Sequence, residues 1–593
     1  MMRRSQRSKR AALLLLSGLV LMVTWVYAQQ ENAPLYALPT SATPVYSSNS
    51  IVRTQNGRTL FAANALNDTI SIVDISQNAI RDEIVVGDDP RTVALTDDET
   101  RLLVTNRAEG TLAIVDLAGE EAQVTASYPV GSLPYAVVTD SDDSAFVSLQ
   151  GNGEIVQVDL ATGAIIMRIA TPPNPTGLVL WGDFLYVTHL WSGELSLIYL
   201  PQKEVVRTIS TGQDTSLFQS FTIDPTSGRA YLPQSRSNAG NTALTYDSAI
   251  LPIINVVDLG NLGLQRNDRI ALNYADRPVN MPFSVALDGV RDLLYVVNAG
   301  SNDLSVIDLD TGLATGHVRV GANPRGVLLS RDGITSYVHN MIDGTLTIIN
   351  NGNLTISDVL PISNITIPVD TLIGAELFYT AADPRMSTNR WMSCASCHFD
   401  GASDGRVWQG FPDGARNTPA LYDLLNTAPY NWSGTWDEVA DVELKIRGLL
   451  VGDGLIEDLQ QPFPALGDPH TGLSPDLDTL VNYLFSLQTP TTPEIQDEAL
   501  VARGAEVFEA LDCASCHTGA TFTDGLLHDV GTDGEFNTPT LRWLWQTAPY
   551  FHDGRAQTLM DVFVLEGAHQ LFGTTPPQDI TALTAYLLSL PQE

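Results

Sequence analysis

Cys394-Ala395-Ser396-Cys397-His398 and Cys513-Ala514-Ser515-Cys516-His517 are identical pentapeptides, and together they contain all four cysteines of the chain. The C-x-x-C-H pattern is typical of c-type haem attachment, in which two thiols bind the porphyrin and the adjacent histidine ligates the iron. The sequence therefore predicts two covalently bound c-type haems. The attachment residues are Cys394, Cys397, Cys513 and Cys516, and the proximal ligands are His398 and His517.

Four cysteines also suit a pair of disulfides or one zinc ion held by four thiolates. Both alternatives explain a bare C-x-x-C, but neither requires a histidine directly after each motif. That histidine is present in both copies and no cysteine is left over, so the pattern favours haem.

The sequence around each motif is duplicated as well. Asn417-Thr418-Pro419-Ala420-Leu421 is matched by Asn537-Thr538-Pro539-Thr540-Leu541, 120 residues later, and Thr427-Ala428-Pro429-Tyr430 is matched by Thr547-Ala548-Pro549-Tyr550 at the same offset. Amphipathic helices are expected before each motif and at the end of each repeat. Two cytochrome c-like helical units follow, residues 366–490 and 494–593, within one all-α di-haem domain over 366–593.

A different repeat fills residues 45–352. Short β-rich segments recur with turns of Gly, Asn and Asp, and Asp74 and Asp116 stand 42 residues apart, as do Asp308 and Asn350. A period near 42 with several short strands per repeat is typical of propeller blades. Seven copies predict an all-β, seven-bladed propeller ahead of the helical domain, with insertions in its fifth and sixth blades, notably around 235–248.

The N-terminus has the pattern of an export signal. Five cations precede an apolar run over residues 11–27, and Val26-Tyr27-Ala28 provides a cleavage site. Residues 1–28 are therefore predicted to be a signal peptide; the alternative is an uncleaved membrane anchor. Export to the periplasm or cell surface agrees with the haem motifs. The net charge of −36 disfavours nucleic acid and anionic lipid as partners and suits a basic redox partner.

The propeller half resembles the YVTN family of β-propellers. The tetrapeptide that gives the family its name appears as Tyr186-Val187-Thr188-His189, Tyr295-Val296-Val297-Asn298 and Tyr337-Val338-His339-Asn340. The resemblance implies the fold; it does not imply a function, because propellers carry many activities.

The helical half resembles the bacterial di-haem cytochrome c peroxidase and MauG-like superfamily. The resemblance is carried by the duplicated haem motif, the N-T-P-x-L elements and Ala548-Pro549-Tyr550-Phe551-His552-Asp553-Gly554. It implies that one haem transfers electrons and the other meets hydrogen peroxide. It also places Trp432 between the haems, although a core aromatic explains this residue equally well.

The sequence departs from that family in the first unit. Peroxidases that need reductive activation have a loop histidine between the first motif and N-T-P, whereas this loop has Arg406 and Trp408 and no histidine. The first haem is therefore expected to have an open sixth position, as in the MauG-like branch. Glu443 and Arg447 are the nearest candidates for the peroxide pocket; the alternative is an exposed i,i+4 ion pair on a helix.

Three residues compete to be the sixth ligand of the second haem. Glu566 occupies the position at which relatives have Met or Tyr. His569 is favoured by chemistry, because imidazole ligates both ferric and ferrous iron, and Met560 is a further candidate. A surface histidine is the alternative for His569.

Three functions remain open. The first is a peroxide-using oxidoreductase whose propeller binds an oxidisable substrate or partner. The second is an electron-transfer cytochrome with a propeller as docking module. The third is a surface-binding propeller with a redox appendage.

Overall fold

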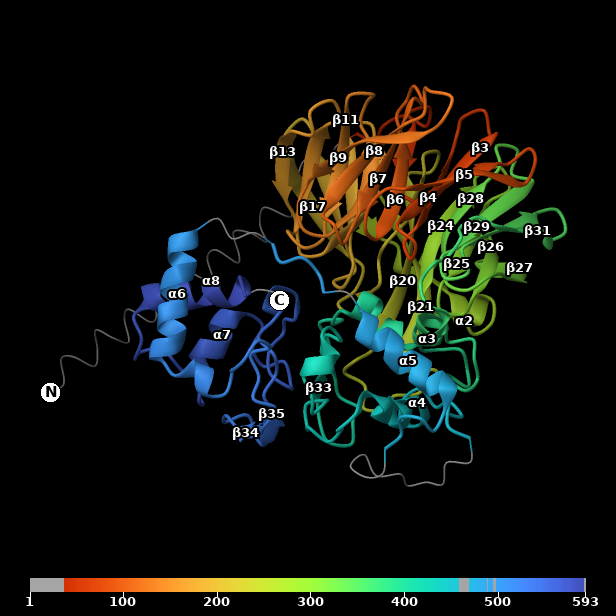
Figure 1. Cartoon of the computed structure of the whole chain (residues 1–593). Helices are drawn as coiled ribbons and strands as arrows, with labels where there is room; N and C mark the ends of the chain where they lie inside the picture. The colour runs from red at the N-terminus through yellow and green to blue at the C-terminus, as the bar shows by residue number, and fades with distance from the viewer. Residues whose placement is uncertain (1–36, 458–468, 488, 494–496, 591–593) are drawn as a thin grey trace.

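The structure, a computed structural model, describes residues 37–457, 469–487, 489–493 and 497–590. A β-propeller is followed by two helical units, one against the propeller and the other to its side (Figure 1). The predicted signal peptide lies outside the described residues. Within the described part of the chain, no helix is long and apolar enough to cross a membrane.

Seven sheets of the described chain form the blades. Their strands are, blade by blade, β2 to β5 (Ile51–Arg53, Thr59–Asn64, Thr69–Asp74, Ala79–Val85), β6 to β9 (Pro90–Leu95, Arg101–Asn106, Thr111–Asp116, Gln123–Pro129), β10 to β13 (Pro134–Thr139, Ser144–Leu149, Glu154–Asp159, Ile165–Ala170), β14 to β17 (Pro175–Trp181, Phe184–His189, Glu194–Tyr199, Glu204–Ser210), β18 to β23 (Thr215–Ser216, Thr222–Asp224, Arg229–Ser237, Ile250–Asp258, Gly263–Leu264, Ile270–Ala271), β24 to β27 (Pro282–Asp288, Leu293–Asn298, Asp303–Asp308, Leu313–Arg319) and β28 to β31 (Pro324–Leu329, Thr335–Asn340, Thr345–Asn350, Thr355–Pro361).

The repeated aspartates build the outer turns of the blades. Asp74, Asp159 and Asp308 each end a third strand, and each accepts hydrogen bonds on one carboxylate oxygen from the backbone N–H two or three residues later, over 2.8–3.2 Å. Such Asx turns favour a tight return into the next strand. The 42-residue period of the sequence therefore reflects the same hydrogen-bonded turn in successive blades.

The repeated asparagines tie the second strand of a blade to its third. The amide of Asn64 donates to the Thr69 and Ser71 hydroxyls over 2.9 and 2.7 Å, and Asn340 does the same with Thr345 and Thr347. His189 replaces this asparagine in blade four and hydrogen-bonds to Ser196 over 2.8 Å. The buried amide N–H groups of Asn64 and Asn340 and the Nε2 atom of His189 thus find their partners within the blade.

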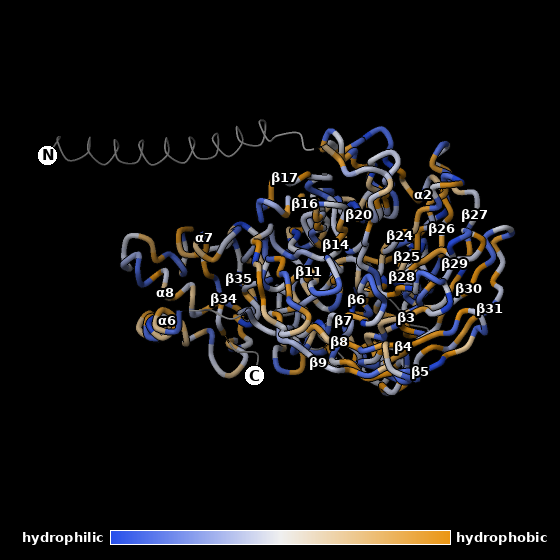
Figure 2. The backbone as a smooth tube through the Cα atoms, turned by 90° about the horizontal axis from the view of Figure 1, so that it is seen from above, coloured by the Kyte–Doolittle hydropathy of each residue, from blue (hydrophilic) through white to orange (hydrophobic). Residues whose placement is uncertain are grey.

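The ring closes between the last blade and the first. The Asn49 amide donates to the Val327 carbonyl over 3.2 Å, and the Arg53 guanidinium donates to the Leu329 carbonyl over 3.0 Å. The short strand β1 (Val45–Ser47) pairs with β14 of blade four. In Figure 2 apolar stretches run along the strands, and both views place α6, α7 and α8 to one side of the blades.

The helical part contains the same set of elements twice. The first unit has α3 (Val369–Tyr379), η2 (Cys394–Ser396), η3 (Phe399–Gly401), β32 and β33 (Val407–Trp408, Arg416–Asn417), η4 (Leu424–Asn426), η5 (Val439–Val442), α4 (Glu443–Gly448) and α5 (Pro475–Ser486). The second has α6 (Glu498–Ala510), η6 (Cys513–Ser515), β34 and β35 (Leu527–Asp529, Glu535–Asn537), η7 (Leu544–Gln546), α7 (Leu559–Val564) and α8 (Pro577–Leu588). The short segments η1 (Arg266–Asp268) and α2 (Leu272–Ala275) belong to the propeller.

A glycine sets the crossing of the paired helices in each unit. A Cβ atom on Gly374 of α3 would collide with the backbone of Thr479 in α5, and one on Gly504 of α6 would collide with the backbone of Ala582 in α8. The repeated Gly-Ala-Glu segments therefore mark the points of closest helix approach, where only glycine fits.

Asp400, two residues after the first haem-motif histidine, joins this unit to the propeller. Its carboxylate lies 2.9 Å from the Arg91 guanidinium of β6 and 3.5 Å from that of Arg325 in β28, and it accepts a 2.7 Å hydrogen bond from Tyr379. Burial alone raises the pKa of Asp400, but the guanidinium groups lower it well below its ordinary value. The carboxylate is therefore charged, and its two ion-pair partners, Arg91 and Arg325, lie on the first strands of their blades.

The hairpin of β20 and β21 makes a second contact. Its loop reaches the first helical unit, where the Gln409 N–H donates to the Ala239 carbonyl over 2.9 Å. Trp391 and Trp408 pack in one cluster with Ala249 and Ile250 of the hairpin. The predicted insertion around 235–248 is thus a contact with the haem unit.

The predicted fold class is confirmed. Two short two-stranded ribbons, β32–β33 and β34–β35, add to the helices expected for the second part. The outer strand of blade seven, β31, extends the propeller to Pro361, past the expected boundary at residue 352.

We predict that Asp400→Asn destabilises the protein by about 3–5 kcal/mol, because it leaves buried guanidinium groups without their counter-charge. The exposed Asp310, which does not face the helical unit, provides the matched control as Asp310→Asn. Urea titration followed by near-ultraviolet circular dichroism measures both. Equal midpoints for the two variants would show that the ion pairs contribute nothing.

Candidate haem sites

The first haem motif lines one large cavity. The Ser393 N–H donates to the Ser396 hydroxyl over 3.0 Å, and the His398 N–H donates to the Cys394 carbonyl over 2.9 Å, which folds the motif into a compact turn. Cys394, Cys397 and His398 then share a wall of a cavity of about 340 Å³. We call it the haem-1 cavity.

The lining of this cavity fits a porphyrin. Most of its wall is apolar or aromatic and includes Trp408, Phe411, Leu421 and Ile446. Burial lowers the pKa of His398 to about 4, while the carbonyls of Pro419 and Ala402 act in the opposite direction. The imidazole is therefore neutral, which is the form that ligates a metal.

The positions of the thiols argue against one zinc ion shared by all four cysteines. Cys394 and Cys397 lie on the haem-1 cavity, and Cys513 and Cys516 lie in the second unit. Among the described residues, the groups of side chains close enough to share a metal ion do not combine the two pairs.

In the second unit, His517 faces another histidine. Its ring centre lies 6.3 Å from that of His569. Metal–imidazole bonds of about 2 Å place two imidazoles that share one metal with their centres roughly 6 Å apart. Burial lowers the pKa of His517 to about 4; the Phe522 carbonyl raises it and His569 lowers it further. The arrangement fits a haem between two neutral imidazoles.

The other two axial candidates lie elsewhere. Glu566 is exposed, and Met560 on α7 is 37% exposed. Burial lowers the pKa of His569. Of the three candidates, the structure brings His569 next to the proximal histidine.

A pseudo-twofold pairing joins the two units. The Asn417 amide donates to the Pro549 carbonyl of the second unit, and the Asn537 amide donates to the Pro429 carbonyl of the first over 2.6 Å. Asn417 and Asn537 occupy equivalent positions of the two repeats, 120 residues apart, and so do Pro429 and Pro549. The contact is self-complementary, as in a twofold dimer. The N-T-P elements therefore fix how the two haem units face each other.

Trp432 lies at this pairing. Its indole N–H donates to the Asn417 carbonyl over 2.8 Å, its carbonyl accepts from the Asn537 N–H over 2.9 Å, and its ring centre lies 6.4 Å from that of His552. The half-buried ring also lines the haem-1 cavity. Trp432 thus contacts the second unit while facing the first cofactor site.

Glu443 and Arg447 take a different position from the one expected. Glu443 is fully buried, and its carboxylate accepts from Arg447 over 2.7 Å and from the N–H groups of Leu455 and Ile456 over 2.9 and 3.2 Å. Neither residue lines the haem-1 cavity. The i,i+4 ion pair between Glu443 and Arg447, which was the alternative, is present. It is buried, and Glu443 also binds the backbone of the segment that follows α4.

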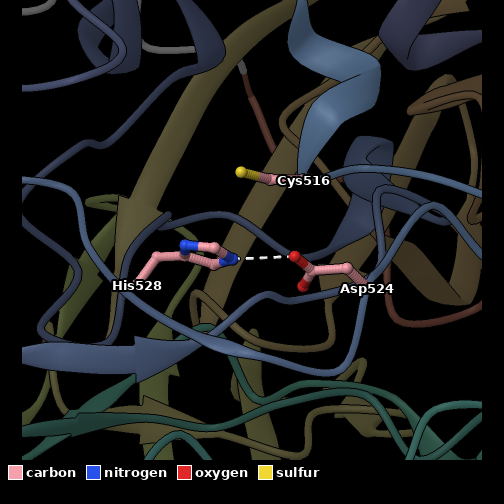
Figure 3. A group of neighbouring side chains, drawn as sticks. All are labelled: Cys516, Asp524 and His528. Carbon is pink, nitrogen blue, oxygen red and sulfur yellow. Dashed lines mark hydrogen bonds and ion pairs between the residues drawn. The ribbon is translucent and has the colours of Figure 1, made fainter.

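Two aspartates, overlooked in the sequence, occupy equivalent places in the units. Asp404 accepts from the Trp408 indole over 3.0 Å in the first unit. In the second unit Asp524 lies 2.7 Å from His528, and both adjoin Cys516 (Figure 3). Because that thiol belongs to the haem motif, the group is a polar pair beside the cofactor. The repeated Asp-Gly dipeptides at 404–405 and 524–525 could have indicated these two positions in the sequence.

Arg406, noted as a departure from the family, binds the propeller. Its guanidinium donates to the carbonyls of Trp191 and Thr215 over 3.2 and 2.7 Å. The loop that contains a histidine in activated peroxidases is here fixed against a blade.

Sequence models of three families match the chain. Residues 27–137 match "Lactonase, 7-bladed beta-propeller", residues 369–457 match "Di-haem cytochrome c peroxidase", and residues 501–591 match "Cytochrome c". The helical half resembles a di-haem cytochrome c peroxidase. This confirms the predicted resemblance and indicates that c-type haem is the cofactor.

Individual relatives agree. Cytochrome c551 peroxidase of Pseudomonas aeruginosa is 27% identical over 271 residues, covering 37% of this chain and 77% of the relative. Methylamine utilization protein MauG of Methylorubrum extorquens is 27% identical over 247 residues, covering 34% and 69%. Among solved structures, Kuenenia stuttgartiensis hydrazine synthase aligns with a TM-score of 0.46 at 17% identity, covering 54% of this chain and 98% of that one.

We predict that Glu443→Ala lowers stability by about 3–5 kcal/mol, because it removes the charge partner of Arg447 and the acceptor of two backbone N–H groups. Urea unfolding of the haem-loaded protein measures the loss. The exposed pair Arg503–Glu506 supplies the control, Glu506→Gln, for which no change is expected. A Glu443→Ala protein of unchanged stability that no longer reacts with peroxide would return Glu443 to the active site.

Proposed function

We propose that this protein is an exported di-haem oxidoreductase that uses hydrogen peroxide at the His398 haem, with the His517 haem as electron-transfer centre. The observation that carries the proposal is the asymmetry of the two sites. His517 faces His569, whereas the described residues that line the haem-1 cavity include no histidine besides His398. Of the same lining residues, Met392 alone offers a thioether, and it lies two residues before Cys394 in the sequence.

This asymmetry separates two kinds of iron chemistry. A c-type haem supplies a redox-active iron, which meets peroxide where its sixth position is open and only exchanges electrons where both positions are filled. At the first site His398 would hold the haem iron, with no second histidine from the described cavity lining. At the second site His517 and His569 would hold it together. The proposal therefore includes the number of haems, which is two, and a different ligation and spin state for each iron.

Trp432 is the proposed path between the sites. It lines the haem-1 cavity and contacts His552 and Asn537 of the second unit. Its indole N–H is fixed by the Asn417 carbonyl, so the ring keeps one orientation.

The propeller is proposed as the docking module for an oxidisable substrate or a basic redox partner. The net charge of −36 of the whole chain supports a cationic partner, because it attracts basic proteins over a distance. The leader at residues 1–28 supports export to the periplasm or cell surface.

We predict that hydrogen peroxide changes the absorption spectrum of the diferric protein directly, without prior reduction, because no loop histidine closes the first site. Stopped-flow mixing measures the reaction. No spectral change would favour a non-catalytic electron carrier.

Trp432→Phe is the companion variant. It should slow electron exchange between the haems and leave both haems attached, since a smaller aromatic ring replaces the indole and the N–H hydrogen bond to the Asn417 carbonyl is lost. Exchange at the wild-type rate would remove Trp432 from the path.

We predict that His569→Ala converts the His517 haem from low-spin to high-spin, because one axial imidazole is lost. Glu566→Gln is the matched control on the same segment and should leave the spectrum unchanged, since Glu566 is exposed. Electron paramagnetic resonance of the ferric protein distinguishes the two states. The opposite pattern, with Glu566→Gln alone altering the spectrum, would identify the carboxylate as the ligand.

A further inference from the structure

The haem-1 cavity contains a lysine that the mechanism above does not use. Lys445, on α4, lines this cavity, as do Phe411 and Trp436. Its side-chain nitrogen lies 4.4 Å from the ring centre of Phe411 and 5.8 Å from that of Trp436. These aromatic residues pack against the side chain along the wall, an apolar setting that favours a neutral amine over an unpaired charge.

The amine of Lys445 has no hydrogen-bonding or ionic partner among the described residues. The two other charged side chains of the lining, Asp413 and Arg416, pair with each other over 2.7 Å, and Asp413 also accepts from Ser433 over 2.7 Å. Glu443, two residues before Lys445, forms its ion pair with Arg447. The charged neighbours of Lys445 are therefore engaged elsewhere, and its nitrogen is available to a cavity ligand.

The residue type is informative in this chain. The sequence has 32 lysine and arginine residues, and three of them are lysines: Lys9, Lys203 and Lys445. Arginine keeps its proton in proteins, whereas a buried lysine loses it readily. Burial lowers the pKa of Lys445, Asp413 raises it and Arg416 lowers it further. Lys445 thus puts a side chain that can gain or lose a proton into the cavity lining, whereas an arginine at this position would carry a fixed charge.

We propose that Lys445 is the proton acceptor of the haem-1 cavity for weak acids of the form HX, hydrogen peroxide among them, that bind at this site as anions. The H–X bond breaks and its electron pair stays on X, which binds as the anion. The proton forms a new N–H bond on the Lys445 amine and remains in the cavity as an ammonium counter-charge. This role rests on the proposed function, because it requires an open position at the His398 haem.

Two ligands separate proton uptake from charge. At neutral pH cyanide is present as hydrogen cyanide and must lose a proton to bind, whereas azide is already an anion. We measure association of each with the diferric, haem-loaded protein by stopped-flow absorption. The variants are Lys445→Gln, Lys445→Arg and the exposed control Lys203→Gln.

We expect cyanide association to slow by roughly 10²-fold in both Lys445 variants, since neither side chain accepts a proton. Azide association should stay close to the wild-type value in both, and Lys203→Gln should match wild type throughout. Lys445→Arg keeps a long side chain against Phe411 and Trp436, so it controls for a simple loss of packing.

Wild-type cyanide rates in both Lys445 variants would overturn the inference. Recovery of the cyanide rate by Lys445→Arg alone would also overturn it, because charge and not proton uptake would then be the requirement. If the wild-type protein binds neither ligand, the site is closed and the proposed function itself fails, which is a distinct result.

Discussion

The exchange of asparagine amides between the two helical units is the constraint on which the haem arrangement depends. Asn417 and Asn537 each donate to a proline carbonyl of the opposite unit, and Trp432 is held between their backbones. Buried amides and carbonyls cost free energy if left unpaired, so the interface has one favourable register. That register sets the position of each haem motif relative to the indole.

The propeller binds the first helical unit of this pair through charged side chains. Charged Asp400 links η3 to arginines of β6 and β28, and Arg406 binds carbonyls of a neighbouring blade segment. The first unit is therefore fixed on both sides of its haem motif, by the propeller and by the second unit. The β20–β21 hairpin adds Leu244 to the cavity lining, so one propeller blade helps to shape the cofactor site. A duplicated sequence thus acquires two different environments.

The repeats carried most of the predictable information. The 42-residue period located the blades because its aspartates and asparagines make local hydrogen bonds, and the 120-residue offset located the paired units. The burial of Glu443 could not be predicted, because its partners Leu455 and Ile456 are ordinary apolar residues whose backbone N–H groups happen to converge on it. Lys445 was missed for a related reason: its aromatic contacts, Phe411 and Trp436, come from irregular loops before α4 whose path the sequence does not reveal. Asp400 gave no signal without the propeller arginines.

The central claim is that two near-identical motifs hold haems of different ligation. Electron paramagnetic resonance of the diferric protein, with haem content measured on the same sample, tests it most directly. The account predicts one high-spin signal and one low-spin signal in equal amounts. Two low-spin signals would mean that the haem-1 cavity closes on the iron, and would contradict it.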